Sequence, residues 1–346
     1  MQEDSKVIGE AWKHFVGFLA MRGYELCFSD WFPDGGTSPW RPRPLLPVAQ
    51  APFRPATNEN FVYEKEDRLD RYPSSWFEWI AVIRHAYDRL GRMLIVKVVQ
   101  QGHNETRILQ YLNSTDLRCN EANHTIPLID CVDSGIGWAF IVMPCWNSKI
   151  MDIFVWQVND YLETAIHAFV GLAFMHEHRV FHRDISYSNI TNNHIGNWEQ
   201  TDFTPFPSIS TFDYRVAFID FGLATQFHKD TPMADCTAND WRGTPSTMAP
   251  EIAAYDPLVE STPYEIGPGD VFALASALLR ELQEETTKRS FLDYSNESES
   301  IVAPPFYEGV YAQRVLLELI PAYQRVMDAA RSVDPKLRPT ASEALD

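Results

Sequence analysis

The chain has 346 residues, of which 45% are hydrophobic and 22% are charged, and its formal net charge is −18. This composition is that of a globular protein with a substantial core, and the length fits a two-lobed domain with an extension. Because nucleic acids and membrane surfaces are anionic, the negative charge argues against both as partners. The five cysteines are scattered and form no C-x-x-C pair, which predicts reduced thiols in an intracellular protein, cytoplasmic or nuclear.

The first 60 residues predict an extension rather than a targeting or membrane segment. The start is acidic, and charged residues and a glycine interrupt the apolar run after Trp12. Apolar residues at helical spacing, with Gly23 placed as a C-terminal cap, predict a short amphipathic helix over 9–22. Seven prolines between 33 and 55 prevent regular structure. That stretch indicates either a packed strap or a disordered linker.

Residues 61–146 predict a small antiparallel sheet with one helix. The stretch from Trp76 to Val99 has the pattern of a hairpin, with two β-rich runs joined by a polar turn. The spacing that follows predicts a helix from His103 to Leu112. Two further strands are expected around 127–131 and 138–143.

Residues 147–346 have a mainly helical pattern. An apolar stripe at helical spacing runs from Leu162 to His176 and includes Ile166, and a second stripe runs from Val271 to Leu282. Stripes of this kind are core, so we assign them no chemistry. A capping box from Thr340 to Glu343 predicts a last short helix.

Three short motifs follow one another in the second half of the chain: His182-Arg183-Asp184 with Asn189, Asp220-Phe221-Gly222, and Ala249-Pro250-Glu251. Phosphoryl transfer requires a carboxylate that orients the attacking hydroxyl, oxygen ligands for Mg²⁺ and a cation on the nucleotide. Asp184 suits the first role, and Asn189 and Asp220 suit the second. Lys97, embedded in an apolar strand, suits the third because a buried cation needs an anionic partner. Three motifs in this order are unlike an accidental set of tripeptides.

These residues resemble the motifs of the protein kinase superfamily over roughly residues 75–346. The His-Arg-Asp-Ile-Ser motif and the N-terminal part are most similar to those of the lineage-specific protein-kinase-like proteins of fungi. The resemblance implies an α+β, two-lobed fold, with a small antiparallel β N-lobe carrying one helix and a larger, mainly helical C-lobe. It also implies ATP and Mg²⁺ as cofactors and a protein substrate.

The resemblance assigns a role to each candidate site residue. Lys97 would contact the nucleotide phosphates while Glu105 holds it, so that the catalytic set is Lys97, Glu105, Asp184 and Asn189. The metal ligands would be Asn189 and Asp220. The nucleotide would also contact Ile95, Met143 at the gatekeeper position, and a hinge made of Pro144, Cys145 and Trp146.

Other residues match architectural positions of the family. Thr244, in a segment that resembles the substrate-docking segment of Ser/Thr kinases, would hydrogen-bond Asp184. Glu251 would form a buried ion pair with Arg338. Asp270 would brace the backbone of the catalytic loop.

Arg183 directly precedes the catalytic carboxylate. In the family this arrangement implies control by phosphorylation of the activation loop, because a phosphate there can neutralise and order the arginine. Thr231 and Thr237 are the candidate phosphorylation sites.

The chain departs from the family pattern at four places. No glycine occurs between Gly36 and Gly91, so a Gly-rich loop over the phosphates is missing. Ile95 stands where a small residue usually faces adenine, and Ser186 stands where Ser/Thr kinases carry a lysine. Residues 191–215 exceed an ordinary hairpin connection, which predicts a surface insertion and a candidate docking element.

Three functions fit these observations. The first is an ATP- and Mg²⁺-dependent protein kinase that phosphorylates Ser/Thr hydroxyls. The second is a pseudokinase that acts as a binding or scaffolding module, which the departures favour. The third is a small-molecule kinase of the aminoglycoside or choline type, which shares the metal ligands, although the Gly-Thr-Pro to Ala-Pro-Glu segment argues against it.

Overall fold

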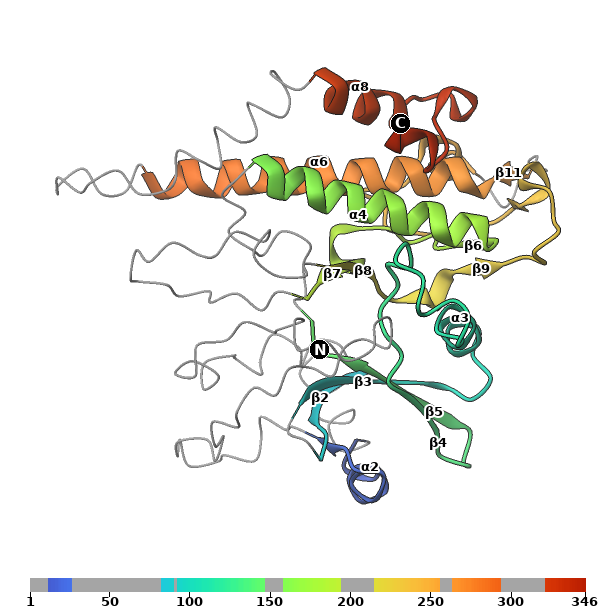
Figure 1. Ribbon diagram of the computed structural model, residues 1–346, viewed down its shortest axis with the longest axis vertical. Helices are drawn as coiled ribbons and strands as arrows, with labels where there is room; N and C mark the ends of the chain where they lie inside the picture. Colours follow the sequence, from blue (N-terminus) through green and yellow to red (C-terminus); the bar gives the residue numbers. More distant parts are fainter. Residues whose placement is uncertain are drawn as a thin grey trace. The chain divides into compact units, whose positions relative to one another are not determined.

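The computed structural model describes residues 12–26, 82–89, 92–146, 158–193, 215–255, 263–293 and 321–346. The chain divides into two compact units (Figure 1). The sheet unit comprises 1–120, 126–147 and 193–204, and the helical unit comprises 121–125, 148–192 and 205–346. The predicted strap, the first part of the predicted hairpin and most of the predicted insertion lie outside the described residues. Within the described ranges, no helix is long and apolar enough to cross a membrane.

The sheet unit contains a five-stranded antiparallel sheet in the order β1-β2-β3-β5-β4. Its strands are β1 Glu25–Leu26, β2 Ile83–Tyr87, β3 Met93–Gln100, β4 Asp130–Asp133 and β5 Trp138–Pro144. The predicted β2–β3 hairpin is confirmed within the described residues. The strand expected from residue 127 begins three residues late: Pro127 has no N–H to donate to a ladder, and the Leu128 N–H is donated to Asn113 Oδ1 at 2.9 Å.

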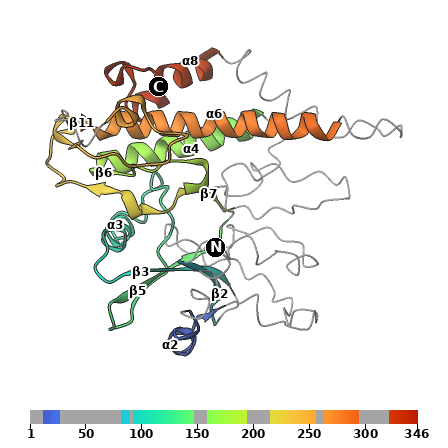
Figure 2. The same cartoon turned by 180° about the vertical axis from the view of Figure 1, so that it is seen from behind.

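One helix of the sheet unit, α3, spans Asn104–Leu112 and confirms the prediction. His103 caps it, since its Nδ1 accepts the backbone N–H of Glu105 at 3.3 Å. Ile108, Leu109 and Leu112 are fully buried. Figures 1 and 2 show α3 on one side of the sheet and the N-terminal helix α2 on the other.

The N-terminal helix is shorter than its sequence pattern predicts. Residues 12 and 13 are helical, a turn follows at 14 and 15, and α2 then spans Val16–Arg22, while 9–11 lie outside the described residues. The predicted cap is confirmed: Gly23 has φ 98° and donates its N–H to the Ala20 carbonyl at 2.9 Å.

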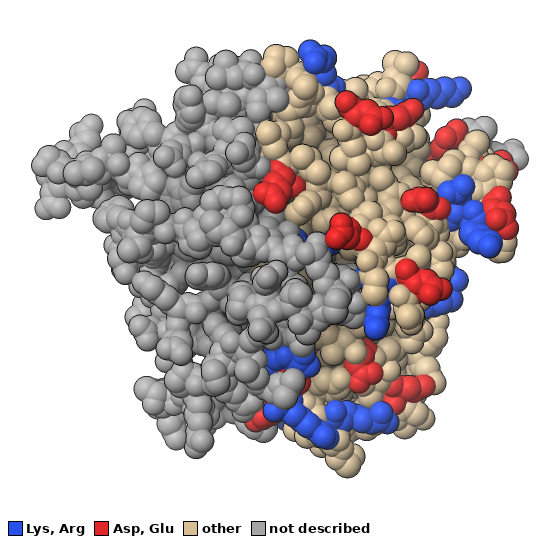
Figure 3. Space-filling view, viewed as in Figure 1, with Lys and Arg blue, Asp and Glu red and all other residues tan. Residues whose placement is uncertain are grey.

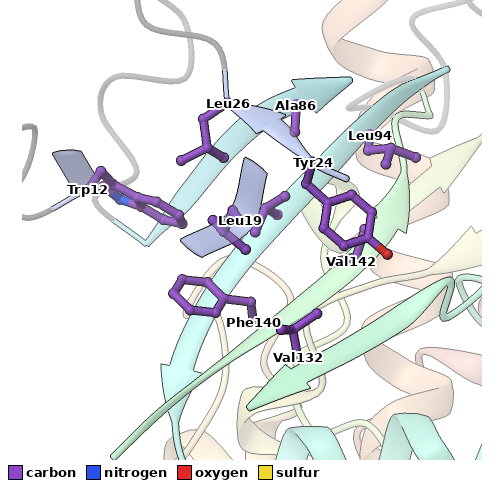
Figure 4. Close-up of a cluster of buried hydrophobic side chains, with 10 residues drawn as sticks. Trp12, Leu19, Tyr24, Leu26, Ala86, Leu94, Val132, Phe140 and Val142 are labelled. Atoms are coloured by element: carbon purple, nitrogen blue, oxygen red, sulfur yellow. The ribbon is translucent and has the colours of Figure 1, made fainter. Parts of the chain in front are cut away.

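Residues 12–26, which we call the N-terminal cover, supply the edge strand β1 and pack apolar side chains on one face of the sheet (Figure 4). Leu19 is fully buried, and the Phe140 ring lies 4.9 Å from the Phe15 ring. The other members of this apolar cluster are Trp12, Tyr24, Leu26, Ala86, Leu94, Val96, Val132 and Val142. The Tyr24 hydroxyl donates to Asp130 at 2.7 Å, and burial raises the pKa of this phenol, so it stays protonated. The cover is therefore an integral layer of the sheet unit.

Leu19→Ala should lower the free energy of unfolding by about 2–5 kcal/mol, because it leaves a cavity between α2 and the sheet. Met21→Ala is the matched control, since Met21 lies on the same helix and is 76% exposed. Chemical denaturation followed by tryptophan fluorescence measures both. Equal stability of the two variants would contradict the packing of the cover on the sheet.

The helical unit is built around two long helices, α4 and α6, which lie side by side with α8 next to α6 (Figures 1 and 2). The described helices are α4 Val158–Glu177, α5 Pro250–Ala253, α6 Ile266–Asp293 and α8 Pro321–Ala330. The described part of the second stripe is buried, from Val271 to Leu278. The first stripe is also core except at Ile166, which is 52% exposed. That prediction was wrong because the buried face is centred on Ala168 and Leu172, and Ile166 lies beyond its edge.

Short strand pairs fix the loops of the helical unit. They are β6 Val180–Phe181 with β9 Thr225–Gln226, β7 Ile190–Asn192 with β8 Val216–Phe218, and β10 Thr237–Ala238 with β11 Tyr264–Glu265. The predicted insertion therefore overlaps β7 at residues 191 and 192, because these residues pair with β8.

The capping box near the end of the chain forms, but the element after it is a 3₁₀ turn, Glu343–Leu345, rather than an α-helix. The Glu343 N–H donates to the Thr340 hydroxyl at 3.2 Å, and the Glu343 carboxylate accepts the Thr340 N–H at 2.8 Å.

Candidate active site

The sheet unit places a buried ion pair beneath the sheet. Lys97 Nζ lies 2.7 Å from Glu105 Oε1, and the two side chains are 10% and 2% exposed. The short connection between them works because Gly102, with φ 78°, turns the chain directly into α3. Glu105 therefore falls in the first turn of α3, where the helix dipole favours a carboxylate. The structure thus brings together the two residues that the sequence predicted as partners.

The other nucleotide candidates lie on or beside the same face. Ile95 is directly opposite Met143 in the β3–β5 register, and side chains two residues apart on a strand share a face, so Lys97 lies on this face too. The Ile95 bulk is therefore next to the ion pair, as expected. The predicted hinge continues from β5: Pro144 ends the strand, Cys145 is buried and Trp146 is partly exposed.

The helical unit holds the Asp184 carboxylate from two sides. Oδ1 accepts the Thr244 hydroxyl at 2.7 Å, and Oδ2 accepts Asn189 Nδ2 at 3.1 Å. The same amide nitrogen also donates to the Asp184 carbonyl at 2.8 Å. Asn189 therefore uses its nitrogen on Asp184, which leaves its amide oxygen to face another partner. The predicted contact between Thr244 and Asp184 is confirmed.

The β7–β8 hairpin brings the two metal candidates to one end of a strand pair. Asn189 directly precedes β7 and Asp220 follows β8, and Ile219 donates its N–H to the Asn189 carbonyl at 3.0 Å. Asp220 is exposed and has a left-handed backbone with φ 62°. A carboxylate and an amide oxygen are hard ligands, and Mg²⁺ often uses only one or two protein ligands together with phosphates. The donor set therefore fits Mg²⁺.

His182 links these two groups of residues, a role that the sequence analysis missed although the motif contains the residue. Its Nδ1 accepts the Asp184 N–H at 3.3 Å, so its Nε2 carries the proton and donates to the Ile219 carbonyl at 2.9 Å. The fully buried imidazole also packs on the Phe221 ring at 5.0 Å. The ring thereby ties the backbone at Asp184 to the segment between β8 and Asp220.

Asp270 fixes the backbone before Asp184, as predicted. It is 2% exposed and accepts the N–H groups of His182 and Arg183, each at 2.8 Å. Arg183 has φ 65°, a left-handed conformation that is uncommon for a side chain of this size, and these hydrogen bonds stabilise it.

The predicted ion pair between Glu251 and Arg338 is also confirmed. It is bidentate, with N–O distances of 2.6 and 2.8 Å, and the Arg338 side chain is fully buried. Arg338 makes a further bond to the Pro268 carbonyl at 3.0 Å. This pair ties the start of α5 to the C-terminal segment and is architectural.

Two further features lie in or beside the loop that carries Asp184. Ser186 is fully buried and its hydroxyl lies 2.9 Å from that of Ser188, so the position that holds a lysine in Ser/Thr kinases carries no charge. A small pocket next to Asp184 is lined by Thr244, Met248 and Ile252 among others.

A family model described as protein kinase domain matches residues 85–346. A search of curated proteins finds no match to the chain. The matched region includes every site residue described above and begins after the N-terminal cover. Its antiparallel sheet and helical part form the α+β, two-lobed kinase fold that the sequence predicted. The chain belongs to the protein kinase family.

Proposed function

We propose that the chain is an ATP- and Mg²⁺-dependent protein kinase that phosphorylates Ser/Thr hydroxyls of protein substrates. The observation that carries this proposal is the Asp184 carboxylate, which Thr244 and Asn189 hold from two sides. A carboxylate fixed in this way can accept a hydrogen bond from a substrate hydroxyl and orient it. Bound Mg·ATP would supply the phosphoryl group.

The other candidate residues support nucleotide binding in this proposal. Lys97 would neutralise phosphate charge, and Glu105 would keep its ammonium in place. Asn189 and Asp220 would hold the metal. Ile95, Met143 and the Pro144–Trp146 segment would contact the base.

The Ser/Thr preference and the choice of partner rest on the helical unit and on charge. The Ser/Thr preference rests on Thr244, which donates to Asp184 and lies in the segment that resembles the substrate-docking segment of Ser/Thr kinases. With a net charge of −18, we expect neutral or basic substrate segments and no nucleic-acid or membrane partner. On the face in Figure 3, basic and acidic side chains of the described residues are interspersed. We also propose an intracellular location, cytoplasmic or nuclear.

A pseudokinase is the second candidate, because Ser186 and the missing glycines remove two features that assist transfer. In this case the chain would keep the fold and bind a partner while transferring little or no phosphate. Separately, we propose from the His182–Ser186 stretch and the N-terminal part that the chain is related to the lineage-specific protein-kinase-like proteins of fungi.

Asp220→Ala should eliminate the Mg²⁺-dependent part of ATP binding, and Asn189→Ala should weaken it less, because a carboxylate binds the cation more strongly than an amide oxygen. Thermal shift measured with ATP alone, Mg²⁺ alone and both together tests this. Asp235→Ala is the control, since Asp235 is an exposed carboxylate of the same unit.

Two outcomes would change the proposal. Equal ATP binding by both variants, with and without metal, would remove Asn189 and Asp220 as metal ligands. A wild-type chain that shows neither a thermal shift at millimolar Mg·ATP nor any phosphate transfer would establish the scaffolding alternative.

A further inference from the structure

The guanidinium of Arg183 is almost fully enclosed, and the structure gives it an anionic partner. Its side chain is 7% exposed, and Nη2 contacts the Asp240 carboxylate. Nη1 donates to the Thr225 hydroxyl at 3.0 Å, and Nη2 also reaches the Tyr264 hydroxyl at 3.3 Å. A buried guanidinium requires a nearby negative charge, and Asp240 supplies it.

Asp240 is itself held in place. Its second carboxylate oxygen lies 2.5 Å from Arg242 Nε, and its carbonyl accepts the Tyr264 hydroxyl at 2.7 Å. Burial raises the pKa of Tyr264, so this hydroxyl keeps the proton that it donates. The carboxylate is one-third exposed and bridges two arginines, Arg183 and Arg242.

The segment before Asp240 is anchored without any modification. The β10 residues Thr237 and Ala238 pair with β11. Cys236 is buried against Phe181 and Ile266, and its carbonyl accepts the Ile266 N–H at 3.1 Å. The activation segment is therefore ordered here by a strand pair, an apolar contact and an ion pair.

The position of Arg183 affects the catalytic carboxylate through close contacts. A Cβ on Gly243 would lie 2.8 Å from the Arg183 carbonyl, and Gly243 has φ 118°, so only glycine fits this approach. The next residue is Thr244, which donates to Asp184. A shift of Arg183 would consequently move the residue that orients Asp184.

We propose that Asp240 is a positioning residue that takes the place of an activation-loop phosphate. It neutralises Arg183 and thereby holds the Gly243–Thr244 backbone and the Asp184 carboxylate in a working arrangement. Phosphorylation at Thr231 or Thr237, which the sequence alone suggested, is then not required. This inference rests on the proposed kinase function for its kinetic consequence, but the ordering of the segment does not depend on activity.

The experiment uses the full chain after phosphatase treatment, with six variants. Four are Asp240→Asn, Asp240→Glu, the double variant Thr231→Val/Thr237→Val, and Asp235→Asn as an exposed-carboxylate control in the same segment. The other two are Arg183→Ala and Arg183→Ala/Asp240→Asn. The kcat and KM of phosphoryl transfer are measured for each. Hydrogen exchange of the amides over 236–248 is measured in parallel, because it reports local order whether or not transfer occurs.

We expect the treated wild type, the double threonine variant and the control to keep their kcat and slow exchange. Asp240→Asn should lower kcat about tenfold or more with little change in the KM for ATP, and should accelerate exchange. Asp240→Glu keeps the negative charge, so it should retain more of the wild-type kcat and of the slow exchange than Asp240→Asn does. We expect Arg183→Ala itself to transfer phosphate slowly, and in that background Asp240→Asn should lower kcat little further, because the two residues act as one pair.

Three results would overturn the inference: an Asp240→Asn variant with wild-type kcat, an Asp240→Asn variant with unchanged exchange, or a wild type that phosphatase treatment reduces to the level of Asp240→Asn. If the wild type transfers no phosphate at all, the proposed function fails. Hydrogen exchange then tests the role of Asp240 independently of activity. Faster exchange in Asp240→Asn, with no change in the wild type after phosphatase treatment, would still support that role.

Discussion

Asp184→Asn should lower the rate of phosphoryl transfer by about 10²- to 10⁴-fold while changing the affinity for Mg·ATP little. The substitution keeps the shape of the side chain, so the bonds to Thr244 and Asn189 can be retained in part. It removes the negative charge that orients the substrate hydroxyl, and this interaction matters mainly in the transition state. Single-turnover kinetics and nucleotide titration measure the two quantities separately.

Asp328→Asn is the matched control for this experiment, because Asp328 is an exposed carboxylate on α8 of the same unit. It should leave both transfer and affinity unchanged. An Asp184→Asn variant that phosphorylates at nearly the wild-type rate would rule out the proposed role of this carboxylate.

Lys97→Met should abolish most nucleotide binding and should also lower the free energy of unfolding by about 3–5 kcal/mol. Both effects have a clear origin. The ammonium that would contact the phosphates is removed, and the Glu105 carboxylate, which is 2% exposed, loses its partner. Nucleotide titration and chemical denaturation measure the two effects, with the exposed Lys229→Met as control.

The double variant Lys97→Met/Glu105→Leu separates the functional effect from the structural one. An apolar pair of similar volume should recover most of the lost stability, because no uncompensated buried charge remains. Nucleotide binding should not recover. If the double variant bound nucleotide as the wild type does, the ion pair would be structural only and the proposed role of Lys97 would be lost.

The sequence predicted those parts of the site in which chemistry and local pattern agree. The places of Asn189 directly before β7 and of Asp220 just after β8 follow from the apolar runs beside them, so their arrival at one end of the strand pair was predictable, whereas the exposure of Asp220 was not. The strand position of Lys97 and the helical pattern after Glu105 matched these residues to positions of the kinase family, and the resemblance implied that they pair, as they do. Long periodic elements such as α4 and α6 were also predictable, because their spacing repeats over several turns.

The missed features depend on contacts between distant parts of the chain. Strand β1 has only two residues, and its partners Ala86 and Tyr87 lie about 60 residues further along, so no local pattern marks it. Asp240 lies in a loop 57 residues after Arg183, and nothing in its neighbourhood indicates which cation it contacts. The exposed Ile166 has another cause: the edge of a helical face is set by what packs against it, which periodicity alone does not specify.

The N-terminal cover also has a consequence for the order in which the chain is made. Residues 12–26 leave the ribosome early, but Phe140 and Val142, on which they pack, follow more than a hundred residues later. At about 5–20 residues per second, the Trp12 and Leu19 side chains have no sheet to cover for roughly 6–26 s. During that interval they form an exposed apolar surface on every nascent chain. The yield of folded protein should therefore depend on translation speed and on chaperones that hold this segment until β5 is complete.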